Sequence, residues 1–92
     1  FDDEIITGAS ISEGARAVLD KGAKDIYAGC VHGTLAGDAV ESLLGAGVQR
    51  LAITDTIPLQ NPSDKVVICS VASLFANAIR AIHDETSISA LF

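Results

Sequence analysis

Short apolar runs bounded by turn residues constrain the fold of this chain more than any other feature. Three runs are clear, at Ile26–Val31, Leu51–Thr54 and Val66–Cys69. Their residues are continuously apolar rather than alternating, which is typical of strands that are buried on both faces of a parallel sheet. Strands of this kind need helices to cover them.

Three segments with helical spacing of apolar residues alternate with these runs. The first spans residues 11–19, opens at the capping-box spacing of residues 10–13, and stops at residues 21–22. The second spans residues 39–44, and the third spans residues 71–82. The three apolar faces consist of Ile11, Ala15, Val18 and Leu19; of Ala39, Val40, Leu43 and Leu44; and of Val71, Leu74, Phe75, Ala78, Ile79 and Ile82.

The order of these elements predicts an α/β fold with a mostly parallel sheet, and we expect three layers with helices on both faces of that sheet. Right-handed crossovers would bring the C-terminal ends of the strands to one edge, where ligands bind in such folds. Residues 55–65 form one long connection. Because residues 1–3 resemble the last step of a strand, we also expect a chain that is truncated at its N-terminus.

Charge and composition narrow the class of protein. The net charge is −6 and 49% of the residues are hydrophobic, which indicates a globular core and argues against nucleic-acid or anionic-membrane binding. Neither a membrane-spanning run nor a signal peptide is visible, so we expect a soluble cytoplasmic protein. Because each lies in an apolar run, Cys30 and Cys69 are expected to be buried free thiols; a disulfide or a metal pair is the alternative.

The stretch from Asp2 to Ser10 carries the chemistry. Two carboxylates, Asp2 and Asp3, precede a turn of small and hydroxyl residues that leads into a helix. A phosphate would fit against residues 6–10, where unpaired N–H groups and the positive end of the helix dipole meet. The acids could then accept hydrogen bonds from sugar hydroxyls or hold Mg²⁺ through its waters. The alternative is structural, with Ser10 as a cap and the acids complementing the dipole.

This stretch resembles the phosphoribosyl-pyrophosphate loop of type I phosphoribosyltransferases and ribose-phosphate pyrophosphokinases. In that family two acids and three further residues usually precede Thr-Gly-Gly-Thr. The present chain has Thr7 and Gly8 followed by Ala9 and Ser10, and it has Glu4 where an apolar residue is typical.

Three further stretches resemble the pyrophosphokinases in particular. Residues 30–39 are similar to their Thr-His-Gly strand-to-helix turn, and residues 54–58 are similar to their Thr-Asn/Asp-Thr-Ile-Pro turn. Residues 70–83 and 87–92 are similar to their C-terminal helix and closing Ser-x-Ser-x-Leu-Phe tail. The resemblance covers nearly all of residues 1–92 and implies one domain, the C-terminal half of such an enzyme.

The resemblance implies the activity, in which a diphosphoryl group moves from ATP to ribose 5-phosphate, with Mg²⁺ as the cofactor. It also implies homo-oligomers, a missing N-terminal half that carries the catalytic loop, and no catalytic residue in this chain, which alone should be inactive. A non-catalytic phosphoribosyl-binding or regulatory module, or a phosphoribosyltransferase fragment, is the alternative. The implied ligands of ribose 5-phosphate are Asp2, Asp3, Ile6, Thr7, Gly8, Ala9 and Ser10, with Asp2 and Asp3 also near the metal.

Three polar residues near strand ends are secondary candidates for the site. His32 follows the first apolar run, and Asp55 and Thr56 follow the second. All three are also ordinary turn residues. The two histidines, His32 and His83, lie in separate segments without metal-ligand spacing.

Overall fold

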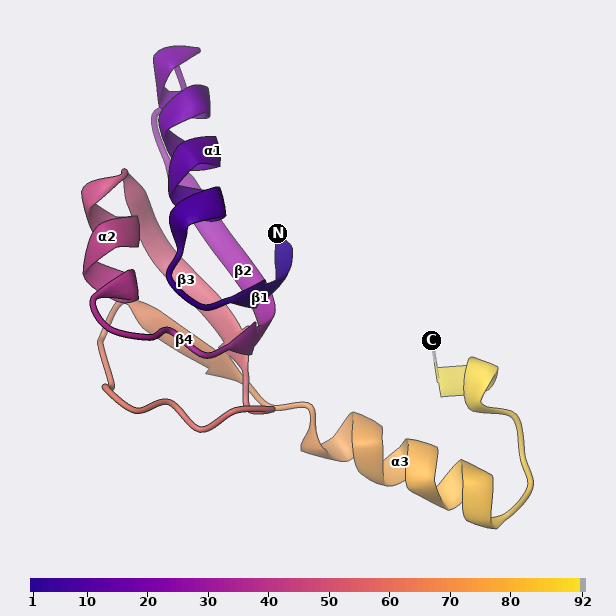
Figure 1. Cartoon of the computed structure of the whole chain (residues 1–92). Helices are drawn as coiled ribbons and strands as arrows, with labels where there is room; N and C mark the ends of the chain where they lie inside the picture. Colours follow the sequence, from indigo (N-terminus) through magenta and orange to yellow (C-terminus); the bar gives the residue numbers. More distant parts are fainter. Residues whose placement is uncertain (92) are drawn as a thin grey trace.

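Four parallel strands, arranged in the order in which they occur in the sequence, form one sheet in the computed structural model of residues 1–91 (Figure 1). The strand and helix predictions are confirmed, while Phe92, the last residue of the predicted tail, lies outside the described residues. The elements are β1 (Asp2–Ile5), α1 (Ala9–Asp20), β2 (Ile26–Gly33), α2 (Ala39–Gly45), β3 (Val48–Thr54), β4 (Val66–Cys69), α3 (Ala72–His83) and the short 3-10 helix η1 (Ile88–Leu91).

Helices α1 and α2 contact each other and lie side by side on one face of the sheet (Figure 1). The strands are added to the sheet in one direction, from β1 to β4. Because crossovers between parallel strands are right-handed, the helices of two successive crossovers lie on the same face of the sheet. The core between these helices and the sheet is made by Ile5, Ala15, Cys30, Leu35, Ala39, Leu43, Ala46, Val48, Leu51 and Ile53.

Helix α3 does not form the expected third layer. It leaves the end of β4 and projects away from the sheet, together with η1 (Figure 1). Within residues 1–91, the face of the sheet opposite α1 and α2 therefore has no helix over it. The prediction of helices on both faces is not confirmed. Helices α1 and α2 each lie between two neighbouring strands of the sheet, whereas within residues 1–91 helix α3 adjoins a strand only at its start.

The predicted capping box at the start of α1 is wrong. The helix begins at Ala9, and its N-cap position is Gly8, whose φ of 82° is left-handed and which has no side chain to act as a cap. Ser10 therefore lies inside the first turn. The predicted end is confirmed, because the helix stops before Lys21 and Gly22 follows with a φ of 98°.

Cys30 and Cys69 are both free thiols, as predicted, and Cys30 is buried. The expectation that Cys69 is also buried is wrong, because it lies at the end of β4 on the face of the sheet that carries no helix in residues 1–91. Burial raises the pKa of the Cys30 thiol, because the thiolate would lose its hydration there. None of the helices in residues 1–91 is both long and apolar enough to cross a bilayer.

Candidate functional site

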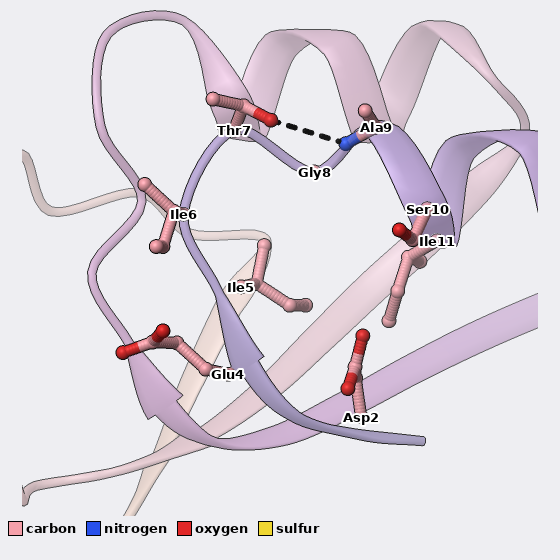
Figure 2. Close-up of a pocket in the computed structure, with 9 residues that line it drawn as sticks. All are labelled: Asp2, Glu4, Ile5, Ile6, Thr7, Gly8, Ala9, Ser10 and Ile11. Atoms are coloured by element: carbon pink, nitrogen blue, oxygen red, sulfur yellow. Dashed lines mark hydrogen bonds between the residues drawn. The ribbon is translucent and has the colours of Figure 1, made fainter.

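A pocket of ≈ 190 Å³ lies where β1 gives way to the start of α1 (Figure 2). It contains five of the loop residues predicted from the sequence, together with Asp2. The volume is below the roughly 300–1,000 Å³ of pockets for drug-sized ligands, which suits a small polar group. Its lining residues are Asp2, Glu4, Ile5, Ile6, Thr7, Gly8, Ala9, Ser10 and Ile11.

The backbone of the loop is held from behind by the segment that follows β2. The N–H of Leu35 donates to the carbonyl of Ile5 at 3.0 Å, and the N–H of Ala36 donates to the carbonyl of Ile6 at 2.7 Å. Leu35 is buried and has a φ of 49°, an unusual conformation for a leucine. Two hydrogen bonds and a buried side chain thus fix the carboxyl end of β1.

Helix α2 supports the turn at Gly8. A Cβ atom at this glycine would lie 3.2 Å from Cγ of Leu43, which is tighter than side chains normally pack. The left-handed φ of Gly8 also disfavours any residue with a Cβ. The sequence therefore needs glycine here both for the turn and for the close approach of α2.

The start of α1 offers hydrogen-bond donors to the pocket. No side chain caps the helix, although Oγ1 of Thr7 accepts from the N–H of Ala9 at 3.4 Å (Figure 2). Ser12 is the first residue whose N–H makes a helical bond, to the carbonyl of Gly8 at 2.9 Å. The backbone N–H groups that precede Ser12 make no helical bond. Together with the positive end of the helix dipole and the Ser10 hydroxyl, they are suited to bind an anion.

The two predicted acids point to opposite sides of β1, because side chains alternate along a strand. Asp2 lines the pocket and Asp3 does not, whereas Glu4, two residues after Asp2, does. The influence of the neighbouring Asp2 side chain, and then the backbone N–H groups of Asp3 and Glu4, lower the pKa of Asp3. Asp3 is therefore a charged carboxylate outside the pocket.

The residues present fit a Mg²⁺ ion that relies mainly on water and substrate oxygens. Within the described part of the chain, no three His, Cys, Asp or Glu side chains cluster as a metal site would require. Proteins commonly hold Mg²⁺ through one or two carboxylates, several waters and substrate phosphates. Asp2 can supply one such carboxylate, and Glu4 lies at the same pocket, although the two point away from each other in Figure 2. The combination of Asp2 and Asp3 stays a prediction.

The secondary candidates separate into two groups, and none of them lines the pocket. Nδ1 of His32 and Oγ1 of Thr56 lie 2.9 Å apart, which joins the ends of β2 and β3. Asp55 instead accepts from the hydroxyl of Ser70 at 2.6 Å and from the N–H of Val71 at 2.9 Å. These bonds, in that order, lower the pKa of Asp55. Asp55 therefore anchors the start of α3.

Sequence reasoning missed Glu4 as a lining residue and Leu35 as the support of the loop. Glu4 could have been found, because a spacing of two residues from Asp2 places both on one face of a strand. Leu35 gave no such signal, because nothing in the sequence marks a leucine that adopts a left-handed backbone.

Comparison with known proteins shows the family. Residues 1–92 match the family described as "Phosphoribosyl synthetase-associated domain", and the chain belongs to it. The relatives include proteins named ribose-phosphate pyrophosphokinase. That of Clostridium tetani (strain Massachusetts / E88) is 44% identical over 94 residues, covering 100% of this chain and 29% of the relative. That of Rhodopirellula baltica (strain DSM 10527 / NCIMB 13988 / SH1) is 46% identical over 94 residues, covering 100% and 30%.

A solved structure also matches. The crystal structure of phosphoribosylpyrophosphate synthetase from Mycobacterium smegmatis superposes with a TM-score of 0.84 and 31% identity, over 91% of this chain and 29% of that chain. The chain thus spans about three tenths of the length of these relatives. The α/β fold is confirmed by this match, whereas the expectation that the segment is the C-terminal half of such an enzyme stays a prediction.

Proposed function

We propose that this chain, as a member of the phosphoribosyl synthetase-associated family, binds the 5-phosphate of ribose 5-phosphate in the pocket at the start of α1. We also propose that the chain is the C-terminal half of a ribose-phosphate pyrophosphokinase. The observation that carries the proposal is one pocket that joins an uncapped helix N-terminus, two hydroxyl side chains and the Asp2 carboxylate.

Each group has a role that its chemistry explains. The N–H groups of the first turn of α1 and the hydroxyls of Thr7 and Ser10 donate to the phosphate oxygens, and Gly8 lets the phosphate approach the backbone. Asp2 accepts from a ribose hydroxyl or binds the metal through water. Bound Mg²⁺ would neutralise the negative charge of the transferred diphosphoryl group.

The reaction that we propose for the whole enzyme moves the β,γ-diphosphoryl group of ATP onto the 1-hydroxyl of ribose 5-phosphate, as a step of nucleotide biosynthesis. Such transfers depend on positioning and charge stabilisation more than on covalent chemistry. The catalytic loop and most ATP contacts belong to an N-terminal half, so that residues 1–92 alone bind without turnover. The whole enzyme would be a cytoplasmic homo-oligomer.

Isothermal titration of ribose 5-phosphate into the chain, with and without Mg²⁺, tests the binding site. Thr7→Ala and Ser10→Ala should each weaken binding about tenfold, the order expected for one hydrogen bond to a charged group. Ser73→Ala, at an exposed position of α3, is the matched control and should bind as the unchanged chain does. Equal affinity in all four proteins would contradict the assignment of the pocket.

Turnover separates the enzyme half from its alternatives. The isolated chain, with ATP, Mg²⁺ and ribose 5-phosphate, should form no phosphoribosyl pyrophosphate, and adding the N-terminal half of a relative should restore formation. Formation of phosphoribosyl pyrophosphate by the chain alone would contradict the proposal that the catalytic loop lies in the N-terminal half. Binding without any restoration would favour a non-catalytic module or a phosphoribosyltransferase fragment.

A further inference from the structure

The segment between β2 and α2 makes two hydrogen bonds to the loop of the candidate phosphate pocket. We call residues 34–38 the support segment. The N–H of Leu35 donates to the carbonyl of Ile5, and the N–H of Ala36 donates to the carbonyl of Ile6. Both acceptors belong to residues that line the pocket (Figure 2). The support segment itself does not line it, so its effect on a ligand would pass through the loop.

The two bonds determine the direction in which two successive peptide groups face. Consecutive carbonyls of an extended strand point in opposite directions because the chain is pleated. The carbonyls of Ile5 and Ile6 instead both accept from the support segment. Because the C=O and N–H of a trans peptide point in opposite directions, the N–H groups of Ile6 and Thr7 face away from that segment. Successive N–H groups on one side of the backbone form the concave arrangement that binds anions.

The opposite orientation of these peptide groups would be unfavourable for a phosphate. A peptide group that turned over would aim its carbonyl oxygen away from the support segment, and the partial negative charge of that oxygen would repel an anion. The pocket is already lined by the side chains of Asp2 and Glu4. The bonds from the support segment thus keep two further oxygens from adding to the negative charge at the pocket.

The buried side chain of Leu35 holds the backbone in the conformation that makes these bonds. Its φ of 49° is uncommon for a leucine and costs free energy. The side chain is 6% exposed and belongs to the same core cluster as Leu43 and Ile53, which offsets that cost. Because the side chain is buried within residues 1–91, its packing does not depend on what else surrounds the chain.

We infer that Leu35 and Ala36 are positioning residues for phosphate binding. They hold the carbonyls of Ile5 and Ile6 away from the anion and so present two backbone N–H groups to it. The inference rests on the proposed function, because the ligand is the one that the proposed function assigns to the pocket. A Leu35 that served only the core would change stability and leave the affinity of the folded chain unchanged.

Two apolar substitutions of Leu35 test the role of its backbone. Leu35→Ile keeps the number of carbon atoms but adds a branch at Cβ, which the left-handed region disfavours strongly. It should lose the two bonds and weaken the binding of ribose 5-phosphate about tenfold in isothermal titration, as expected for hydrogen bonds to a charged group. Leu35→Met is unbranched at Cβ and of similar volume, so it should bind as the unchanged chain does.

A second pair of variants tests the bond to Ile6 without changing the core. Ala36 is exposed. Ala36→Pro removes the N–H that donates to the carbonyl of Ile6 and also forces Leu35 toward an extended backbone. It should weaken ribose 5-phosphate binding about tenfold. Ala36→Ser keeps the N–H and should bind as the unchanged chain does. This pair decides the inference even if Leu35→Ile does not fold.

Two further measurements separate positioning from stability. Without ligand, the amides of residues 35 and 36 should exchange hydrogen about tenfold faster in Leu35→Ile than in Leu35→Met, because they lose their acceptors. Leu51→Ala is the stability control, since Leu51 is 2% exposed in β3 and does not line the pocket. It should lower the melting temperature and leave the affinity unchanged at a temperature where circular dichroism shows the variant folded.

Three outcomes would overturn the inference. The first is a folded Ala36→Pro that binds ribose 5-phosphate as tightly as Ala36→Ser. The second is equal affinity in Leu35→Ile and Leu35→Met. The third is a loss of affinity in folded Leu51→Ala as large as that in Leu35→Ile, which would show an effect of stability alone. An unchanged chain that binds no ribose 5-phosphate is a different result, because it would overturn the proposed function and this inference with it.

Discussion

Helices α2 and α3 have the same kind of amphipathic sequence and end in opposite environments. In α2, Leu43 is 1% exposed and lies between the sheet and the turn at Gly8. In α3, Ile79 has the equivalent place in an apolar stripe and is 67% exposed. The difference teaches that helical periodicity predicts an apolar face but not the surface that covers it.

The connections explain the difference. Helix α2 lies between β2 and β3, which are neighbours in the sheet, so the chain must return along the sheet and press the helix against it. Within residues 1–91, helix α3 is connected to a strand only at its start, and Asp55 fixes its direction there. The placement of α3 therefore depends on two polar contacts rather than on a crossover.

Truncating one side chain in each helix is the strongest way to break this comparison. Leu43→Ala should lower the free energy of unfolding by about 2–5 kcal/mol, as expected for a buried leucine whose removal leaves a cavity. Ile79→Ala should cost less than about 1 kcal/mol, because the side chain is already in water. Urea denaturation of the two variants and the unchanged chain would measure both losses, and equal losses would show that α3 is packed like α2.

Substitution of Gly8, the glycine that α2 approaches, should have the next largest effect on stability. Gly8→Ala should destabilise the fold by about 1–3 kcal/mol and weaken ribose 5-phosphate binding, because the left-handed φ and the contact with Leu43 both exclude a Cβ. Gly14→Ala, in the interior of α1 with open space around it, should instead stabilise by about 0.5–1 kcal/mol. Thermal melts and titrations of the two variants would check the contrast, which fails if Gly8→Ala binds and melts as the unchanged chain does.

Replacing Asp55, which anchors the start of α3, should have the smallest effect on the fold. The pKa of Asp55 is lowered in the folded chain by the bonds from Ser70 and Val71. The contribution of the anchor is therefore complete above the ordinary carboxyl pKa and is lost as the pH falls through the depressed value. Hydrogen exchange of the Val71 and Ala72 amides should rise severalfold in Asp55→Asn at neutral pH.

The control for this experiment is the amide hydrogen exchange of α2. That exchange should be the same in Asp55→Asn and in the unchanged chain, because the hydrogen bonds of Asp55 go to Ser70 and Val71 and not to α2. An α3 whose amide exchange is also unchanged in the variant would show that another contact positions the helix.

Much of the architecture followed from local patterns. The runs at Leu51–Thr54 and Val66–Cys69 are strands, as their short continuous apolar sequences predicted. The segment around Leu43 is a helix with a buried face, as its helical spacing of apolar residues predicted. The loop at residues 6–10, where a phosphate site was predicted, lines a pocket, and its binding of phosphate stays a prediction. The start of α1 was placed too late, because the left-handed backbone of Gly8 opens the helix before the hydroxyl of Ser10 could act as a cap.

The division of the acid pair was not predicted for a similar reason. Adjacent carboxylates at Asp2 and Asp3 suggested a shared role, but inside a strand neighbouring side chains point to opposite faces. Glu4 joins Asp2 at the pocket instead. The sequence placed the end of the strand at residues 1–3, whereas pairing with β2 continues it to Ile5 and so includes Glu4.

The sequence by itself determined the elements, the parallel sheet and the loop of small and hydroxyl residues, because these depend on local propensity and spacing. Only the tertiary structure decided that α1 and α2 share one face, that Leu35 and Leu43 hold the loop, and that the stripe of α3 is exposed. These features depend on contacts between segments far apart in the chain, whose geometry is set by crossovers and side-chain packing rather than by any local pattern.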